Sequence, residues 1–411
     1  MQNIIINIGR GQEKMKEYRY LSGVYGTINI PSNSQIIIDK GADVIASSDI
    51  NDYIVDENSI YVETSENEKG RSLFYAKGRE NIVISGKKDS TINGNGTSWN
   101  NGRDFFRRPG LIRLVDCKNV VIKDLTLLAS PCWSISLHNC ENVTIERVQI
   151  VSLWCISNYG IDIDCCRHIV INDCVINSYD DAVVLKSTKN IPAYDINISN
   201  CNINSQWAAF KIGTESVGDI KDVKFKNIAG EWANGCIVKM VPTDGGSIKN
   251  IEISDVCFGQ SIGLIFIANG ERKWSYYKGE TSEKFSTIED VKLKRISIKQ
   301  AIETKLPNPF IKGCVFISGT KKHKIKNVII EDCEFAVSGG EEKVEKSGKR
   351  FEVEELKKQY PEYYALGVPP AYGAYLRHID SVILRNVKFN LKKPDVREEI
   401  VAVDVDGFLR D

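Results

Sequence analysis

The residues that could do acid–base chemistry in this chain gather near its middle. Asp180 and Asp181 stand side by side just before the run AVVLKS, and Asp162 and Asp164 alternate with isoleucines in GIDID. Carboxylates held close together can serve as a general acid and a general base. A solvated polar face would show the same alternation, so this pattern alone leaves both interpretations open.

The two runs that carry these acids have the pattern of short β-strands. Apolar and polar residues alternate with period 2, which predicts strands with one buried face. The predicted inward residues are Ile161, Ile163, Val183 and Leu185. Asp164 and Lys186 lie 22 residues apart, about one turn of a solenoid. If the strands stack as neighbouring rungs, Lys186 shares one outer surface with four carboxylates.

A repeated phrase explains how such stacking would arise. Ten copies of a polar residue followed by an alternating strand run along the chain, among them ENVTIERVQI, RHIVINDCVI, YDINISNCNI, KDVKFKNIAG and KNIEISDVCF. From Glu141 to Lys249 the copies follow one another at steps of 26, 27, 27 and 28 residues. A fixed period in this range indicates a repeat architecture. Each period holds short strands separated by Asn, Asp and Gly. The sequence therefore predicts an all-β fold, a parallel β-helix of about ten rungs.

The cysteines follow the same repeat. Cys174, Cys201 and Cys333 share one position of the phrase, and Cys117, Cys140 and Cys166 share another. Metal ligands or disulfides would be one explanation. We favour stacked small hydrophobic residues inside the coil, because whole-rung spacing does not match the short CxxC spacing of a metal site. No metal site and no cofactor is expected.

Composition restricts the possible partners and location. Lys+Arg and Asp+Glu both number 54, so no basic field suggests nucleic acid or a membrane surface. No apolar run reaches about 18 residues, so no membrane-spanning helix is expected. The first residues lack the pattern of a signal peptide, and twelve cysteines without such a signal suggest thiols in the cytoplasm. The oligomeric state stays open.

Three segments depart from the repeat. We expect residues 1–411 to form a single domain, in which 1–35 make an N-terminal cap. The polar and aromatic stretch 269–287 is expected to leave one rung and overhang a cleft. The charged stretch within 339–372 is expected to be a surface excursion, because such charge runs are usually solvated.

These features resemble family 28 of the glycoside hydrolases, the polygalacturonase family. The motifs that carry the resemblance are GIDID…DDAVVLKS, INGNGTSW, and RPGLIRLVDCKNVVIKDLTLLASPCWSISLHNCENVTI. The tail YPEYYALGVPPAYGAYLRH is similar to an offshoot of the family. The resemblance covers most of the chain and implies a right-handed parallel β-helix. It also implies cleavage of glycosidic bonds in oligosaccharides of pectin type, containing uronate or rhamnose.

The family's active-site pattern is kept only in part. The Asp-Asp pair is intact as Asp180 and Asp181. Tyr159 stands where the family's first aspartate should be, and Trp207 stands where its histidine should be. Ile237 replaces the arginine of an Arg-x-Lys strand, and Lys239 keeps its lysine.

Aligning the rungs suggests what replaces the missing groups. The expected outward columns are Asp162, Val184, Lys211, Ile237 and Asp164, Lys186, Gly213, Lys239. Neighbouring rungs lie about 4.8 Å apart, so the acidic pair would be within one or two rungs of the lysines. Opposite charges this close would keep carboxylates ionised or hold an anionic ligand. A column of surface charges that only neutralise one another would give the same sequence pattern.

The resemblance implies roles for these residues. Asp180 would be the general acid and Asp181 part of the base in an inverting mechanism, with Asp162 or Glu215 substituting for the missing aspartate. The cationic residues expected to bind a uronate carboxylate are Lys211, Lys239 and Arg272. Trp207 could stack on a sugar ring, or be a structural residue. Tyr159, Asp164, Lys186 and Glu215 are the remaining candidates for substrate contact.

Two other functions stay open. The chain could be a non-catalytic carbohydrate-binding β-helix that has lost its water-activating pair. It could also be a polysaccharide lyase or epimerase, in which a lysine removes the proton beside a uronate carboxyl group. The retained Asp-Asp turn favours hydrolysis over this last function.

Overall fold

The fold is known from a computed structural model, which describes residues 15–56, 70–99, 107–276, 281–301, 314–340, 353, 355, 358–363 and 368–411. The chain divides into two compact units. Unit 1 consists of Met1–Val184, Ala193–Asn202 and Ser275–Gly279. Unit 2 consists of Leu185–Pro192, Ile203–Trp274 and Glu280–Asp411.

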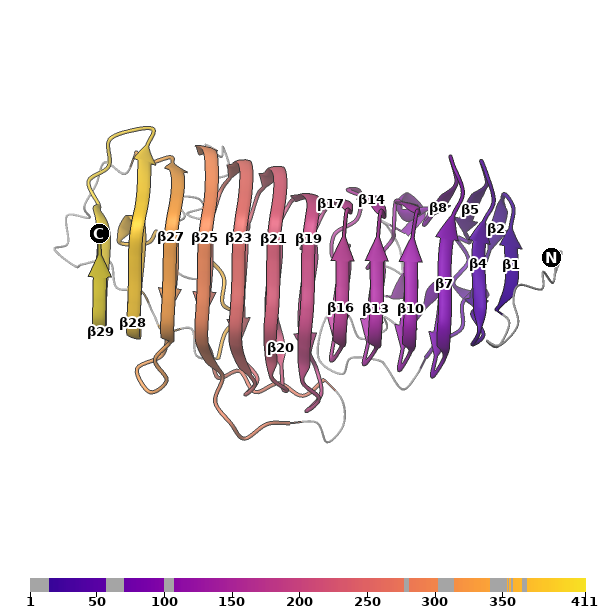
Figure 1. The fold of residues 1–411 in the computed structure, drawn as a ribbon, viewed down its shortest axis with the longest axis horizontal. Helices are drawn as coiled ribbons and strands as arrows, with labels where there is room; N and C mark the ends of the chain where they lie inside the picture. Colours follow the sequence, from indigo (N-terminus) through magenta and orange to yellow (C-terminus); the bar gives the residue numbers. More distant parts are fainter. Residues whose placement is uncertain are drawn as a thin grey trace. The chain divides into compact units, whose positions relative to one another are not determined.

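Unit 1 is built from short parallel strands and two 3₁₀ turns in its described part (Figure 1). Its strands are β1 (Lys16–Tyr20), β2 (Gly23–Tyr25), β3 (Ile28–Asn29), β4 (Ser34–Ile38), β5 (Asp43–Ala46), β6 (Ser72–Lys77), β7 (Glu80–Gly86), β8 (Thr91–Asn93), β9 (Gly110–Val115), β10 (Lys118–Lys123), β11 (Thr126–Leu128), β12 (Ile135–His138), β13 (Glu141–Glu146), β14 (Gln149–Ser152), β15 (Ile161–Asp164), β16 (Arg167–Asn172) and β17 (Val175–Ser178). The turns are η1 (Ile50–Asp52) and η3 (Gly96–Trp99).

Unit 2 has longer strands. They are β20 (Ala208–Ser216), β21 (Ile220–Ala233), β22 (Cys236–Pro242), β23 (Ser247–Ser261), β24 (Ile265–Ala268), β25 (Thr287–Ala301), β26 (Val315–Ser318), β27 (Lys326–Val337), β28 (Ala371–Leu391) and β29 (Glu398–Arg410). Two strands carry residues of both units, β18 (Val183–Ser187) and β19 (Ala193–Ser205).

Each strand pairs in parallel with the strand one coil later. In unit 1 one ladder runs β4–β7–β10–β13–β16, and another runs β6–β9–β12–β15. In unit 2 the ladders are β21–β23–β25–β27–β28 and β20–β22–β24–β26–β28. This is a right-handed parallel β-helix, as predicted. Nowhere in the described residues is there a helix long and apolar enough to cross a bilayer.

The core consists of apolar columns that run from coil to coil. In unit 1, Ile82, Val120, Val143, Ile169 and Ile196 occupy one register position. All five are buried, at 1% exposure or less. Each coil buries its β-branched side chains against those of the next, which is how a solenoid grows without a single globular core.

The asparagine of the repeated phrase marks a corner of the coil. Asn33, Asn81, Asn119 and Asn142 all have φ between 53° and 56°, the left-handed region that asparagine tolerates better than most residues. The side-chain amides of Asn81, Asn119 and Asn142 each donate to the side-chain Oδ1 of the preceding asparagine in this series, at 2.8, 3.1 and 3.2 Å. The phrase KNV therefore encodes a turn and a hydrogen-bonded ladder together.

The cysteines are thiols, as predicted, and all except the half-buried Cys257 are buried. Several of the Sγ atoms contact backbone carbonyls, for example Cys140 Sγ, which lies 3.4 Å from the carbonyl oxygen of Leu114 in the preceding coil. Burial raises the pKa of Cys314 to about 12 and that of Cys333 to about 11. These thiols serve as small packing groups.

The segments expected to depart from the repeat are described in part. β1, β2 and β3 pair in register with β4, β5 and β6, so residues 16–29 continue the coil; residues 1–14 lie outside the described part. The charged run 341–352 also lies outside it. The described residues between Val353 and Tyr363, here called the strap, are partly buried, so they are more than a solvated excursion.

Candidate active site

The Asp180-Asp181 turn links β17 to β18. Within it the N–H of Asp181 donates to Oδ1 of Asp180 at 2.8 Å, and Ser178 Oγ donates to the carbonyl of Asp180 at 2.6 Å. The preceding amide, that of Tyr179, donates to Asn158 Oδ1 at 3.0 Å. Asp180 is half-buried and Asp181 is fully buried. The turn therefore holds two carboxylates in different environments, as an acid and a base require.

The acids of β15 are not on an exposed surface. Asp162 and Asp164 are 0% and 1% exposed, so the solvated polar face that the alternation left open does not apply to them. Lys186 is also fully buried, which likewise contradicts an open charged face. Alternation identifies the side of a strand that points away from the coil, but it does not reveal whether other residues cover that side.

A buried polar network holds Asp164. Its Oδ2 lies 3.2 Å from His138 Nδ1. His138 Nε2 lies 2.7 Å from Arg113 Nη1 and 2.7 Å from Ser136 Oγ. A guanidinium can only donate, so Nε2 accepts and the hydrogen on Nδ1 is donated to Asp164. The network fixes both the imidazole and the carboxylate in unit 1.

Sequence reasoning missed Arg113, Ser136 and His138. In the observed register Arg113 aligns with Ser136 and Asp162, and His138 aligns with Asp164. The outward columns drawn for GIDID could have been extended backwards through ISLH and IRLV. That extension would have found all three residues.

Tyr159, expected from the sequence to stand in place of an aspartate, is buried against an aromatic ring. It stacks on Trp133 with ring centroids 5.5 Å apart and an interplanar angle of 10°. Trp133 in turn stacks on His138 at 6.4 Å. Because only 8% of Tyr159 is exposed, its ring contributes to the architecture around the histidine network.

In unit 2 the structure brings together four of the predicted residues. Burial would raise the pKa of Glu215, but Lys186, Lys211 and Arg272 together hold it below its ordinary value. Glu215 and these three cations form a buried charged group. Whether it faces the acids of unit 1, as the expected single cleft requires, stays a prediction.

The register of the lysines differs from the expected columns. Lys211 pairs with Lys239, whereas the alignment placed Lys211 beside Ile237 and Gly213 beside Lys239. The expected register was wrong by two residues. A shift of two keeps every side chain on its own face, so alternation could not detect it.

Both lysines are bound by the strap. Lys239 forms an ion pair with Glu362, and the two residues are 0% and 5% exposed. Lys211 Nζ donates to the Tyr360 hydroxyl at 2.9 Å. Lys239 Nζ also lies 5.0 Å from the centroid of the Tyr360 ring, a cation–π contact.

Arg272 is held by contacts within unit 2, and Trp207 lies in a turn of the same unit. Arg272 Nε and Nη2 donate to the two carboxylate oxygens of Asp244 at 3.3 and 3.1 Å, and its guanidinium lies 4.0 Å from the Trp274 ring centroid. This bidentate pair holds the start of the stretch 269–287, of which residues 277–280 lie outside the described part. Trp207 is half-buried in the turn before β20. Whether it contacts a sugar stays a prediction.

A comparison with models of protein families shows to which family the chain is related. A family model described as glycosyl hydrolases family 28 matches residues 23–354, which is most of the chain. The chain belongs to this family. The match includes the acidic turn, the histidine network and both strap-bound lysines.

Individual relatives of family 28 agree. The chain is 28% identical over 244 residues to a probable polygalacturonase of Vitis vinifera, across 56% of this chain and 50% of that protein. It is 28% identical over 232 residues to a probable rhamnogalacturonase B of Aspergillus fumigatus, across 54% and 40%. The chain thus aligns with half or less of the length of these relatives.

A solved structure shares the fold. The exopolygalacturonase of Thermotoga maritima superposes with a TM-score of 0.61 at 18% identity, covering 91% of this chain and 84% of that one. At this identity the likeness supports the parallel β-helix alone.

Proposed function

We propose that the chain is a glycoside hydrolase that cleaves glycosidic bonds in oligosaccharides of pectin type. The observation that carries the proposal is the intact Asp180-Asp181 turn within the region that matches family 28. Relatives named polygalacturonase and rhamnogalacturonase support a substrate containing galacturonate or rhamnose.

In the proposed mechanism Asp180 protonates the leaving glycosidic oxygen, because it is the more exposed carboxyl of the pair. Asp181 activates water, as an ionised carboxylate can. Asp162 supplies the second carboxylate in place of the missing aspartate. Water attacks the anomeric carbon as the glycosidic bond breaks, and the configuration inverts. Trp207 provides a face for a sugar ring.

The substrate is proposed to be a short oligosaccharide met in the cytoplasm. Twelve thiols are compatible with a reducing compartment. Rapid loss of viscosity on incubation with long pectin would contradict this preference, because it would show random cleavage inside a polymer.

The testing experiment is a screen of purified protein against pectic oligosaccharides, with product anomers followed by NMR. The expected result is hydrolysis in which the first product has the inverted anomeric configuration. A product with a 4,5-double bond would indicate a lyase instead. Binding without turnover on every oligosaccharide would favour the alternative that the chain is a non-catalytic carbohydrate-binding protein. The residues Tyr159 and Trp207, which stand in place of a catalytic aspartate and histidine, favour the same alternative.

A further inference from the structure

The outward face of unit 2 changes character from charged to aromatic along one register position. Lys211 pairs with Lys239, Lys239 with Phe266, Phe266 with Phe316, and Phe316 with Tyr375. Two adjacent buried ammonium groups repel each other and require an anion or strong acceptor nearby. In a protein that binds acidic sugars, a uronate carboxylate would be the natural partner.

In this chain the partner is internal. The Glu362 carboxylate meets Lys239, and the Tyr360 hydroxyl accepts from Lys211. Glu362 is buried with its lysine, so the pair is screened little by solvent or salt. A substrate carboxylate would have to displace a carboxylate that is already held beside Lys239.

The fold fixes the strap in this position. The hydroxyl of Tyr363, the residue after Glu362, lies 2.7 Å from the carbonyl oxygen of Cys314 and 3.0 Å from that of Ile265, and these two acceptors share its one hydrogen. Its ring packs edge-on against Phe266, with centroids 4.7 Å apart. Because the neighbouring tyrosine is anchored in the core, Glu362 has little freedom to leave Lys239.

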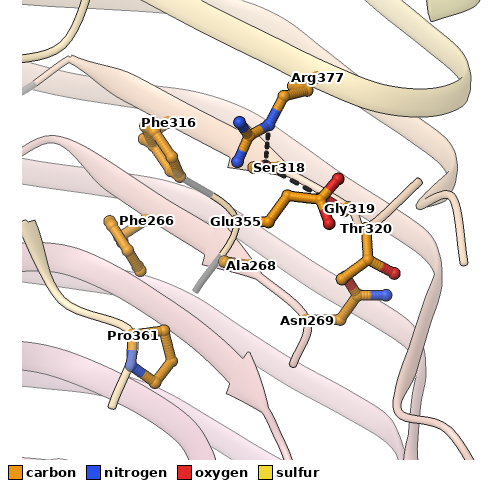
Figure 2. Close-up of a pocket in the computed structure, with 10 residues that line it drawn as sticks. All are labelled: Phe266, Ala268, Asn269, Phe316, Ser318, Gly319, Thr320, Glu355, Pro361 and Arg377. Atoms are coloured by element: carbon orange, nitrogen blue, oxygen red, sulfur yellow. Dashed lines mark hydrogen bonds between the residues drawn. The ribbon is translucent and has the colours of Figure 1, made fainter. Parts of the chain in front are cut away.

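A second set of contacts holds the other end of the strap. Glu355 pairs with His378 at 2.9 Å, and Arg377 donates to the carbonyl of Val353. Figure 2 shows Glu355 and Pro361 lining a pocket together with Phe266 and Phe316, with a volume of about 290 Å³ that includes its open mouth. Arg377 donates to Ser318 at 2.9 Å across this pocket, so its charge is directed at protein groups.

We infer that Glu362 is a specificity-determining residue that occupies the place of a substrate carboxylate at Lys239. The part of the substrate that reaches this face is therefore a neutral sugar unit, and a uronate is rejected there. Phe266, Phe316 and Tyr375 beyond Lys239 are buried and uncharged, so this register position offers a carboxylate no cation besides the two lysines. This inference deepens the proposed function by naming the sugar class at one position.

The test compares D-galacturonate with D-galactose. Galacturonate has a carboxylate where galactose has a hydroxymethyl group. Glu362→Ala exposes Lys239 and should lower the melting temperature. At 100 mM, galacturonate should then raise the melting temperature of this variant by about 1–2 °C, given a Kd of about 10 mM. Galactose should produce no such rise, and the double variant Lys239→Met/Glu362→Ala should show no rescue by galacturonate.

A second measurement uses the unmutated protein, so it does not depend on the folding of a variant. Galacturonate should leave the melting temperature of the parent unchanged. A rise in the parent that Lys239→Met removes would overturn the inference, as would a folded Glu362→Ala variant that galacturonate does not stabilise. These measurements do not use turnover. The inference about Glu362 can therefore fail while hydrolysis is observed, and it can hold while hydrolysis is absent.

Discussion

His138 and Asp164 form a buried hydrogen bond, with Nδ1 and Oδ2 3.2 Å apart. The other nitrogen of the ring is held by Arg113, so the imidazole bridges a guanidinium and a carboxylate. The same pairing occurs on the surface of unit 1, where His168 Nδ1 lies 2.7 Å from Asp195 Oδ2. The chain thus contains a buried and an exposed version of one interaction.

This duplication allows a matched test of the buried network. His138→Asn should lower the free energy of unfolding by about 1–3 kcal/mol, because buried polar groups lose their partner. His168→Asn should change it by about 0.5 kcal/mol or less, because water replaces the lost bond. Urea titrations of both variants would measure the difference. Equal losses would show that the buried network around Asp164 contributes no more to stability than the surface pair does.

The charge of Glu215 should give stability a specific pH dependence. Its pKa lies below the ordinary value in the folded protein, because Lys186, Lys211 and Arg272 outweigh the opposing effect of burial. Its stabilising contribution is therefore present above the unfolded-state pKa and is lost as pH falls through the folded-state pKa. Glu215→Gln should melt at a lower temperature than the parent at pH 7, and the gap should close below about pH 4. Glu283→Gln, at a side chain that is 98% exposed, is the control. A gap that stays constant with pH would contradict the prediction.

Asp180→Asn and Asp181→Asn should each reduce turnover by about 10²–10⁴-fold if the turn is catalytic. An asparagine at 180 can still accept the hydrogen bond from the Asp181 amide through its Oδ1, so that variant should stay folded. Asp181 is fully buried, so its variant also needs a melting curve to confirm folding. Asp173→Asn, at an exposed corner of the same unit, should keep full turnover. Full turnover in both Asp180→Asn and Asp181→Asn would exclude the turn as the catalytic site.

The thiols offer a test of the coil itself. In denaturant a thiol reagent should modify all twelve cysteines. In the native protein only the half-buried Cys257 should react readily, because the other thiols are buried. Mass spectrometry after brief labelling would locate the modified residues. Rapid native labelling of Cys140 or Cys166 would show that the coil opens, and native disulfides would contradict both the packing and the cytoplasmic proposal.

The fold could be predicted from sequence because one physical pattern repeats. The corner residues such as Asn119 and Asn142, and the apolar columns beside them, recur at each coil. What could not be predicted is the pairing register of distant coils. Lys211 and Lys239 were misaligned by two residues, because a shift of two leaves every side chain on the same face of its strand and so keeps the alternating pattern unchanged.

The candidate site was harder to predict, because its residues depend on contacts between remote segments. Asp180 and Asp181 were found from their adjacency. The partner of Lys239 is Glu362, which lies 123 residues later along the chain and belongs to a segment that looked like a solvated excursion. His138 is one coil away from Asp164 and could have been found by extending the repeat backwards.

The asparagine corners of unit 1 also affect how the protein ages. In that ladder Asn119 both donates to Asn81 and accepts from Asn142, so each amide depends on the next. Spontaneous hydrolysis of the Asn119 amide to a carboxylate removes the donor to Asn81 and leaves its carbonyl oxygen beside a new negative charge. The damage therefore reaches the neighbouring coil.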